Sequence, residues 1–328
     1  MPKALICGIG GQDGSYLAEL LLGKGYEVWG TSRDAQTASL LNLKTLGLTG
    51  RLRLLSMAPN DFRSVLLAVE RSDPDEIYYL AGQSSVGLSF EQPAETLESI
   101  VSAVLNLLEV IRLRGGRIRL YNAGSSECFG DTGSTAATET TPFFPRSPYG
   151  VAKASAHWLV ANYREAYGLF CCTGILFNHE SPLRPARFVT RKIVSAAARI
   201  AAGSDETLVL GNLDIARDWG WAPEYVDAMH RMLVAGQPQD YVIATGHTAR
   251  LEDFVATAFA HYGLDWRAHV KTSSEFARPN DFRTSRADPS LAATGLDWRA
   301  KVLMPEVVRR MCDAEMTSGV SAAPFQRL

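Results

Sequence analysis

Two polar residues in this chain have a spacing that could support proton transfer from a hydroxyl group. Tyr149 and Lys153 are four residues apart, so on a helix they would share one face. A neighbouring ammonium favours the tyrosinate, and we therefore expect Lys153 to lower the pKa of Tyr149 from its usual value of about 10. Tyr149 would then act as a base towards a sugar or alcohol hydroxyl near neutral pH.

A second polar group, Ser125-Ser126-Glu127, precedes this pair in the chain. Glu127 adds a carboxylate base, which simple alcohol oxidation does not require. The combination indicates an enzyme that oxidises a carbinol and then carries out further chemistry on the neighbouring carbon. The competing interpretations are a surface carboxylate at Glu127 and an ordinary helix pair at Tyr149 and Lys153.

The composition excludes several classes of protein. Of the 328 residues, 46% are hydrophobic and the net charge is −2, so the chain can bury a sizeable core and has no basic excess for nucleic acid. No segment approaches the ~20 apolar residues that span a bilayer. The five scattered cysteines match no metal-binding pattern, which predicts reduced thiols, no metal site and a cytoplasmic location.

Short apolar runs alternate with amphipathic stretches through the first half of the chain. This alternation predicts an α/β protein with a parallel, doubly wound sheet of the Rossmann type. The expected helices are 16–22, 96–113, 251–260, 305–315 and a long one from Ser147-Pro148 to Tyr167. The expected strands are 4–7, 27–29, 52–55, 77–80, 118–121, 173–177 and 241–243.

After Asn178 the alternation ends, and residues 214–221 have the pattern of loops mixed with short helices. We therefore expect two interleaved units. Residues 1–178 would form the dinucleotide-binding domain, to which segments around 212–250 return. Residues 179–328 would mainly form a smaller C-terminal α/β lobe that binds the substrate.

A glycine-rich segment lies between the first expected strand and the first expected helix. In this context glycines permit a tight turn, close approach of a pyrophosphate and close helix packing. The segment therefore predicts a dinucleotide site, with an ordinary glycine turn as the alternative. The residues expected to bind the cofactor here are Gly8, Gly11, Gln12, Asp13 and Gly14.

The end of the second expected strand indicates which dinucleotide binds. Enzymes that use NAD commonly carry an acid there to hold the ribose hydroxyls. Here Ser32 and Arg33 take that place, and the planar guanidinium of Arg33 can pair with a 2′-phosphate. NADP is thus expected over NAD, although the carboxylate of Asp34 would repel the phosphate unless it turns away.

Longer segments resemble a known family, the GDP-mannose 4,6-dehydratases of the extended short-chain dehydrogenase/reductase superfamily. The matching strings extend over most of the chain up to about Gly246. Ser126 fits this family, since the related dTDP-glucose dehydratases carry aspartate immediately before the glutamate. The strings are GQDGSYLAELLLGKGYEVWG, SFEQP, TPFFPRSPYG, NYREAYGLF, GILFNHESP, FVTRKI, GNLDIARDWG and VIATG.

The resemblance implies an NADP-dependent hydro-lyase that converts GDP-mannose to GDP-4-keto-6-deoxymannose. Tyr149 would remove the 4-hydroxyl proton while hydride leaves C4 for the nicotinamide. Lys153 would tune Tyr149 and hold the nicotinamide ribose, so both residues also belong to the expected cofactor site. Ser125, where the family usually has threonine, would hydrogen-bond the 4-oxygen. Glu127 would remove the C5 proton and protonate the departing C6 hydroxyl, before hydride returns to C6.

The resemblance also implies a set of substrate contacts. Arg217 and Arg278 match positions that contact the diphosphate of the nucleotide sugar. The other matches are Ser84 beside the hexose, the substrate-contacting Asn178, Val189 and Lys192 in the guanine-binding stretch, and Asp281 near the guanosine ribose.

Departures from the family pattern leave alternatives open. Ser85 replaces a histidine beside the hexose, so another nucleotide sugar such as a GDP-heptose could be the substrate. A GDP-sugar 4-reductase or epimerase would not require Glu127, and a non-enzymatic NADP sensor would be expected to lose part of the catalytic set. The loop after Asp34 is shorter than the one that joins relatives into tetramers. A homodimer is therefore expected, and a tetramer is left open.

Overall fold

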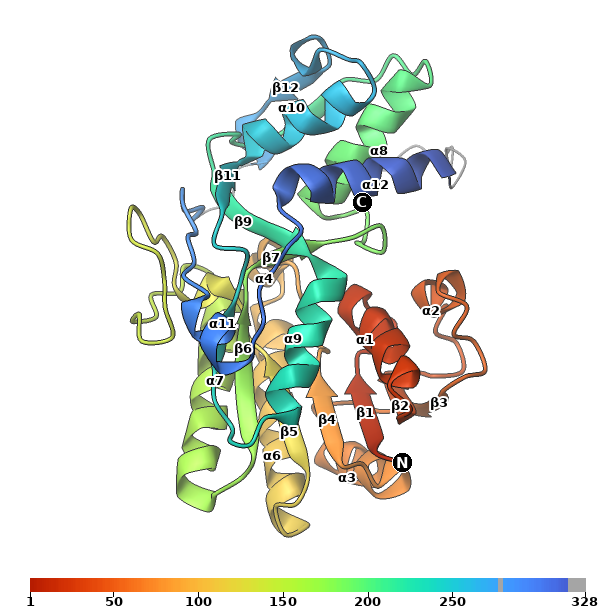
Figure 1. Ribbon diagram of the computed structural model, residues 1–328, viewed down its shortest axis with the longest axis vertical. Helices are drawn as coiled ribbons and strands as arrows, with labels where there is room; N and C mark the ends of the chain where they lie inside the picture. The colour runs from red at the N-terminus through yellow and green to blue at the C-terminus, as the bar shows by residue number, and fades with distance from the viewer. Residues whose placement is uncertain (277–279, 318–328) are drawn as a thin grey trace.

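The computed structural model of the protein describes residues 1–276 and 280–317, and within them a seven-stranded sheet forms the centre (Figure 1). Adjacent strands are parallel, in the order β10-β6-β5-β4-β1-β2-β3. This confirms the predicted doubly wound sheet, and the order reverses between β1 and β4, where such sheets open a crevice for ligands. The strands are β1 (Lys3–Cys7), β2 (Glu27–Ser32), β3 (Arg53–Ser56), β4 (Glu76–Tyr79), β5 (Arg119–Ala123), β6 (Cys171–Leu176) and β10 (Tyr241–Ile243).

Helices cover both faces of this sheet. Successive side chains of β1 alternate between the two sides, so that Leu5 packs in one hydrophobic core and Ile6 in the other. Burial on both sides explains why central strands such as β1 and β4 are nearly continuous apolar runs. The helices on the Ile6 side are α1 (Gln12–Gly23), α9 (Ala222–Val234) and α11 (Ser290–Gly295), and those on the Leu5 side are α3 (Phe62–Ser72), α6 (Ala103–Leu113) and α7 (Pro148–Tyr167).

The single helix expected at 96–113 is interrupted by one π-helical turn, η1 (Glu98–Ser102). The turn lies against β4, because the Tyr79 hydroxyl donates to the Ser99 carbonyl at 2.5 Å. Gly82 is also packed here, since a Cβ on it would lie 2.9 Å from the same oxygen. The short elements nearby are α2 (Leu41–Thr45), α4 (Val86–Glu91), α5 (Pro93–Leu97) and η2 (Ser126–Cys128).

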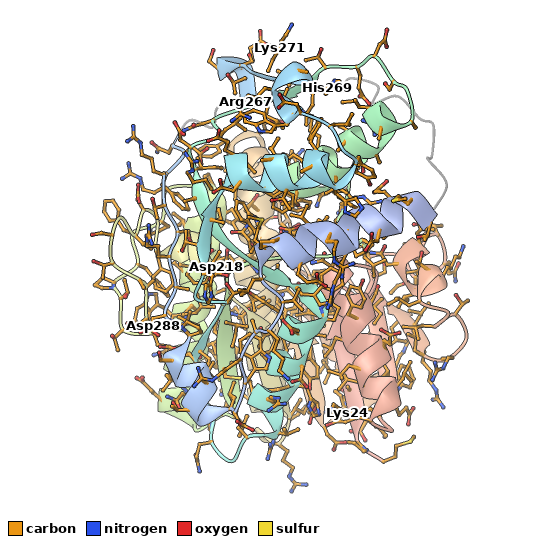
Figure 2. All side chains as sticks on the ribbon, turned by 45° about the horizontal axis from the view of Figure 1, so that its top comes forward. Lys24, Asp218, Arg267, His269, Lys271 and Asp288 are labelled. Carbon is orange, nitrogen blue, oxygen red and sulfur yellow. The ribbon has the colours of Figure 1, made fainter. Side chains whose placement is uncertain are left out.

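A smaller lobe lies above the carboxyl ends of the sheet strands (Figure 1). It has its own core, in which Trp219, Phe254 and Met311 are fully or almost fully buried. Arg267, His269 and Lys271 lie at the outer end of the lobe, away from the sheet (Figure 2). The lobe contains α8 (Val189–Ala201), β8 (Leu208–Leu210), α10 (Leu251–His261), η3 (Trp266–Ala268), β12 (Val270–Thr272), η4 (Ser274–Phe276) and α12 (Met304–Thr317).

A small second sheet joins the lobe to the main sheet. Its strands are β7 (Asn178–Glu180), β9 (Ala216–Trp221) and β11 (Thr248–Arg250), with β9 in the middle. The sequence-based prediction of loops and short helices at 214–221 is therefore wrong. That segment carries charged residues, and it forms a strand because both neighbours pair with its backbone. From β9 the chain continues into α9 and β10, which return to the main sheet.

None of the helices in the described part of the chain has the length and apolar character needed to cross a lipid bilayer.

Candidate active site

Helix α7 packs closely against the turn that follows β5. The hydroxyl of Ser147 accepts a hydrogen bond from the Gly150 backbone N–H at 3.0 Å, which caps the start of the helix. A Cβ on Gly150 would lie 2.8 Å from the Glu127 carbonyl oxygen, so a larger residue there would push the two segments apart. The first two turns of α7 carry Tyr149 and Lys153, and both side chains are buried.

The turn after β5 brings the other two predicted catalytic residues to the same place. The Ser125 hydroxyl hydrogen-bonds the phenol of Tyr149 and accepts from the Glu127 backbone N–H at 3.3 Å. The Glu127 carboxylate is close enough to raise the pKa of Tyr149 electrostatically. Ser125, Glu127, Tyr149 and Lys153 therefore form one cluster at the carboxyl end of β5.

Burial controls the ionisation of this cluster. It raises the pKa of Tyr149, and the Ser125 hydrogen bond and the Arg184 guanidinium offset only part of that effect. Burial also lowers the pKa of Lys153 to about 8, and its ammonium donates to the Ala123 carbonyl at 2.7 Å. The expectation that the pKa of Tyr149 is lowered from its usual value is thus wrong here. Desolvation dominates, and the positive charge of Arg184 opposes it only in part.

The glycine-rich loop after β1 is a close-packed turn. Gly8 has a φ of +89°, and a Cβ on it would lie 2.9 Å from the backbone nitrogen of Ala81. A Cβ on Gly14 would lie 2.4 Å from the Gly8 carbonyl oxygen. No side chain among the described residues caps α1, which begins after Gly11. A compact loop followed by an uncapped helix start suits the diphosphate of a dinucleotide.

Ser32 ends β2, and the exposed Arg33 follows it directly. The Asp34 carboxylate is engaged by its own turn, because it accepts hydrogen bonds from the Gln36 backbone N–H at 2.9 Å and the Thr37 hydroxyl at 2.8 Å. The hydrogen bond from Thr37 is the main reason that the pKa of Asp34 is lowered. Asp34 thus has local partners for its charge, whereas Arg33 extends into solvent.

Three residues expected to contact the substrate, two of them at the guanine, lie where the lobe meets the small sheet. Val189 and Lys192 are in the first turn of α8, and Asn178 begins β7. The half-buried ammonium of Lys192 donates to the Val209 carbonyl at 2.7 Å, and burial lowers its pKa. A cavity of about 540 Å³ opens in the lobe just beyond Val209, and its lining residues include Gly211, Asn212, Leu213, Asp214, Trp266 and Thr272.

Arg217 is buried in β9 and held by backbone carbonyls. Its guanidinium donates to the Phe282 carbonyl at 3.1 Å and the Arg283 carbonyl at 3.2 Å, and lies 3.4 Å from a carboxylate oxygen of Asp281. These contacts place Asp281 beside Arg217. Arg278 lies outside the described residues.

Ser84 is exposed in the loop between β4 and α4, where its hydroxyl accepts from Arg187 at 3.2 Å.

Sequence reasoning missed Arg184. Its guanidinium stacks 3.9 Å from the Phe188 ring centroid, and its Nε lies 3.0 Å from a carboxylate oxygen of Glu180. It acts electrostatically on both Tyr149 and Asp13, and so connects the catalytic cluster with the glycine-rich loop. Its one signal in the sequence is its position two residues after the end of the family-like string GILFNHESP.

Asp218 follows Arg217 on β9 and lies inside the protein (Figure 2). One carboxylate oxygen accepts from the Thr245 backbone N–H at 3.0 Å and from its hydroxyl at 2.9 Å. The other oxygen is buried without a hydrogen-bond partner among the described residues. Burial raises the pKa of Asp218 to about 6, even though the turn at Thr245 stabilises the charged form.

Comparison with known proteins decides the family. The sequence model described as GDP-mannose 4,6 dehydratase matches residues 5–311. The chain belongs to the GDP-mannose 4,6-dehydratase family. GDP-mannose 4,6 dehydratase 1 of Arabidopsis thaliana is 42% identical to this family member, over 95% of this chain and 89% of the relative. The human GDP-mannose 4,6 dehydratase is 40% identical, over 95% of this chain and 91% of the relative.

Solved structures show the same fold. The dTDP-glucose 4,6-dehydratase of Streptomyces venezuelae superimposes with a TM-score of 0.86, covers 96% of this chain and 97% of its own, and is 21% identical. The resemblance to GDP-mannose 4,6-dehydratases is therefore confirmed by sequence, and the Rossmann-type architecture by structure.

We expect Asp218→Asn to remove part of the pH dependence of stability. Folding raises the pKa of Asp218 from 3.8 to about 6. The contribution of Asp218 to the free energy of unfolding is therefore fully present below the unfolded pKa and is lost as pH rises through the folded pKa. The shift corresponds to roughly 3 kcal/mol. Urea unfolding at about pH 4, pH 5 and pH 7.5 measures it, with the exposed Asp205→Asn as control. Identical pH profiles for wild type and Asp218→Asn would contradict this assignment.

Proposed function

We propose that this protein is an NADP-dependent hydro-lyase that converts GDP-mannose to GDP-4-keto-6-deoxymannose. Relatives that are about 40% identical over nearly the full chain are named for this activity. The observation that carries the proposal is that Ser125 links Glu127 and Tyr149: its hydroxyl accepts from the Glu127 backbone N–H and hydrogen-bonds the phenol, so that the Glu127 carboxylate acts on the pKa of Tyr149. A second base beside the first is what dehydration needs after C4 is oxidised, and what a reductase or epimerase does not need.

A nicotinamide dinucleotide, when bound, accepts the hydride that leaves C4 and returns it at C6. The close-packed turn at Gly8 and Gly14 and the uncapped start of α1 support binding of its diphosphate, with Gly11, Gln12 and Asp13 as further contacts. The Streptomyces venezuelae relative was solved with NAD, which supports the cofactor class.

The four clustered residues would divide the proton transfers between them. Tyr149, held by the hydroxyl of Ser125, takes the proton of the sugar 4-hydroxyl. Lys153 holds the nicotinamide ribose and supplies positive charge next to the forming phenolate. The ketone at C4 makes the C5 proton acidic. Glu127 then removes that proton and protonates the C6 hydroxyl, which leaves as water. When hydride returns to C6, C5 takes up a proton, and the one that Tyr149 received from the 4-hydroxyl would balance the reaction.

The nucleotide sugar would bind where the lobe meets the main sheet. Arg217 is a buried cation with fixed geometry, which supports a contact to the diphosphate, and Arg278 is proposed as its partner. Lys192 donates to the carbonyl of Val209, two residues before Gly211 in the lining of the lobe's cavity, which supports a guanine site in this part of the lobe. Val189 is proposed as a further contact there. Ser84, Asn178 and Asp281 complete the proposed substrate contacts, near the hexose and the ribose.

These assignments give the two interleaved units different binding roles. We propose that residues 1–178, with parts of 212–250, bind the cofactor, and that residues 179–328 mainly bind the GDP-sugar. A cytoplasmic location is proposed because all five cysteines, each in the described part of the chain, are buried free thiols.

We expect Glu127→Gln to reduce dehydration at least about 100-fold, because loss of a general base costs roughly that much or more. The readout is mass spectrometry of GDP-mannose for loss of one water. The first turnover of Glu127→Gln should still produce reduced cofactor by absorbance, whereas Tyr149→Phe should produce neither signal.

The exposed Glu165→Gln on the same helix is the control. Dehydration at the wild-type rate in Glu127→Gln would overturn the role of this carboxylate. Consumption of added NADPH without loss of water in the wild type would instead identify a reductase.

NADP is proposed over NAD because the exposed Arg33 follows β2, while Asp34 is engaged by its own turn. We expect Arg33→Ala to weaken NADP binding roughly 10- to 100-fold, as for loss of a charge-assisted hydrogen bond, and to leave NAD binding nearly unchanged. Calorimetric titration with both cofactors measures this, with Arg63→Ala as control. Equal losses for NADP and NAD would contradict a phosphate contact.

A homodimer is proposed through α6 and α7. Val151 and Trp158 are seven residues apart on α7, on one face, and are 44% and 61% exposed. Large apolar side chains on the surface often mark a contact with another protein. The exposed apolar residues of these two helices are Leu105, Leu113, Val151, Trp158 and Tyr167.

We expect Trp158→Glu to convert the dimer to monomers, because a carboxylate in the middle of this apolar surface would have to be desolvated. Light scattering after size-exclusion chromatography measures the mass. Leu41→Glu, at a site 66% exposed on α2, is the control. A wild-type monomer, or a Trp158→Glu dimer, would refute this interface.

A further inference from the structure

A buried polar network joins the start of α1 to β7. The Gln12 side-chain amide donates to the His179 carbonyl at 3.1 Å, and its oxygen accepts from the Ser181 hydroxyl at 2.8 Å. The neighbouring residue, Asp13, contacts the His179 ring, although the two are 166 residues apart in the chain. The glycine-rich loop and the strand that begins with Asn178 are therefore held together through these side chains.

The surroundings of His179 determine its charge. One ring nitrogen, Nδ1, lies 2.7 Å from the Phe177 carbonyl oxygen, and the other, Nε2, lies 2.8 Å from a carboxylate oxygen of Asp13. A carbonyl and a carboxylate oxygen can only accept hydrogen bonds. Both ring nitrogens therefore carry a proton when Asp13 is ionised, which makes the ring an imidazolium paired with a carboxylate.

Two further observations agree with a buried ion pair. Burial alone would lower the pKa of His179, but the contact with Asp13 outweighs it and the pKa is raised. The pKa of Asp13 is lowered despite its burial, because of the charge and hydrogen bond of His179. The ring of Tyr225 stacks on the imidazolium at a centroid distance of 4.6 Å and shields it from solvent.

The Asp13–His179 pair lies beside the proposed binding site of the anionic cofactor, where a net charge would affect binding. Asp13 is in the first turn of α1, next to the loop proposed to hold the cofactor diphosphate. An uncompensated carboxylate there would repel a bound anion and compete with it for the positive end of the helix dipole. Arg184 acts on Asp13 from farther away, and His179 is the cation in direct contact with it.

We infer that His179 is a positioning residue for the anionic cofactor. It acts through Asp13, whose charge it neutralises and whose loop it fixes against β7. The inference rests on the proposed cofactor site. It adds a requirement beyond the glycine motif, namely a cation paired with Asp13. Wherever Asp13 is ionised, His179 must be ionised with it for the loop to accept a diphosphate.

The test is a double-mutant cycle on NADP affinity, measured by calorimetric titration of the purified full chain. His179→Gln leaves the Asp13 carboxylate without its partner, and we expect the dissociation constant for NADP to rise about tenfold or more. Asp13→Asn removes the carboxylate charge, and the double variant removes the imidazolium as well. Adding His179→Gln to Asp13→Asn should then change the dissociation constant less than about threefold, so the two substitutions are not additive.

The outcomes separate this inference from the proposed function. If the wild type does not bind NADP or NAD, the proposed cofactor site fails first. If the wild type binds NADP and His179→Gln binds it equally well, His179 has only a structural role and the inference is overturned. The same conclusion follows if His179→Gln weakens binding by the same factor with and without Asp13→Asn. If His179→Gln alone does not fold, the comparison of Asp13→Asn with the double variant decides.

Discussion

The close approach of α7 to the carboxyl end of β5 is the constraint on which the catalytic cluster depends. Gly150 allows it, because any Cβ there would meet the Glu127 carbonyl at 2.8 Å. Lys153 secures it through the 2.7 Å hydrogen bond to Ala123, the last residue of β5. The contact also excludes water from Tyr149 and Lys153, and desolvation then disfavours the charged form of each group. The geometry that assembles the cluster thus also sets its proton affinities.

A second constraint is the anchoring of the lobe. The strand β9 lies between β7 and β11 and leads directly into α9, which packs on the main sheet. Arg217 is fixed within β9 by carbonyls of residues 282 and 283, which come from a distant part of the chain. The glycine-rich loop is tied to β7 by Gln12 and Asp13. The proposed cofactor and substrate sites are therefore both anchored to one small sheet.

Several elements could be predicted from the sequence because their signals are local. The predicted bounds of β1 to β5 and β10 agree with the structure within a few residues, and most of these strands are apolar runs buried on both sides, whereas the edge strand β3 is largely exposed. The helix from Pro148 to Tyr167 has a serine cap and a proline start. The strand β9 was missed because buried charges such as Arg217 and Asp218 do not resemble a strand pattern. The π turn at Ser99 was missed because it accompanies a contact with Tyr79.

By itself, the sequence determined the fold class, the family and the identity of the four clustered residues, since periodicity, glycine spacing and motif order are properties of neighbouring residues. Only the tertiary structure decided the ionisation of Tyr149 and Lys153, the participation of Arg184 and the charge of the Asp13–His179 pair. Proton affinity depends on burial and on charges brought close in space. Those quantities do not exist until segments 166 residues apart in the chain come into contact.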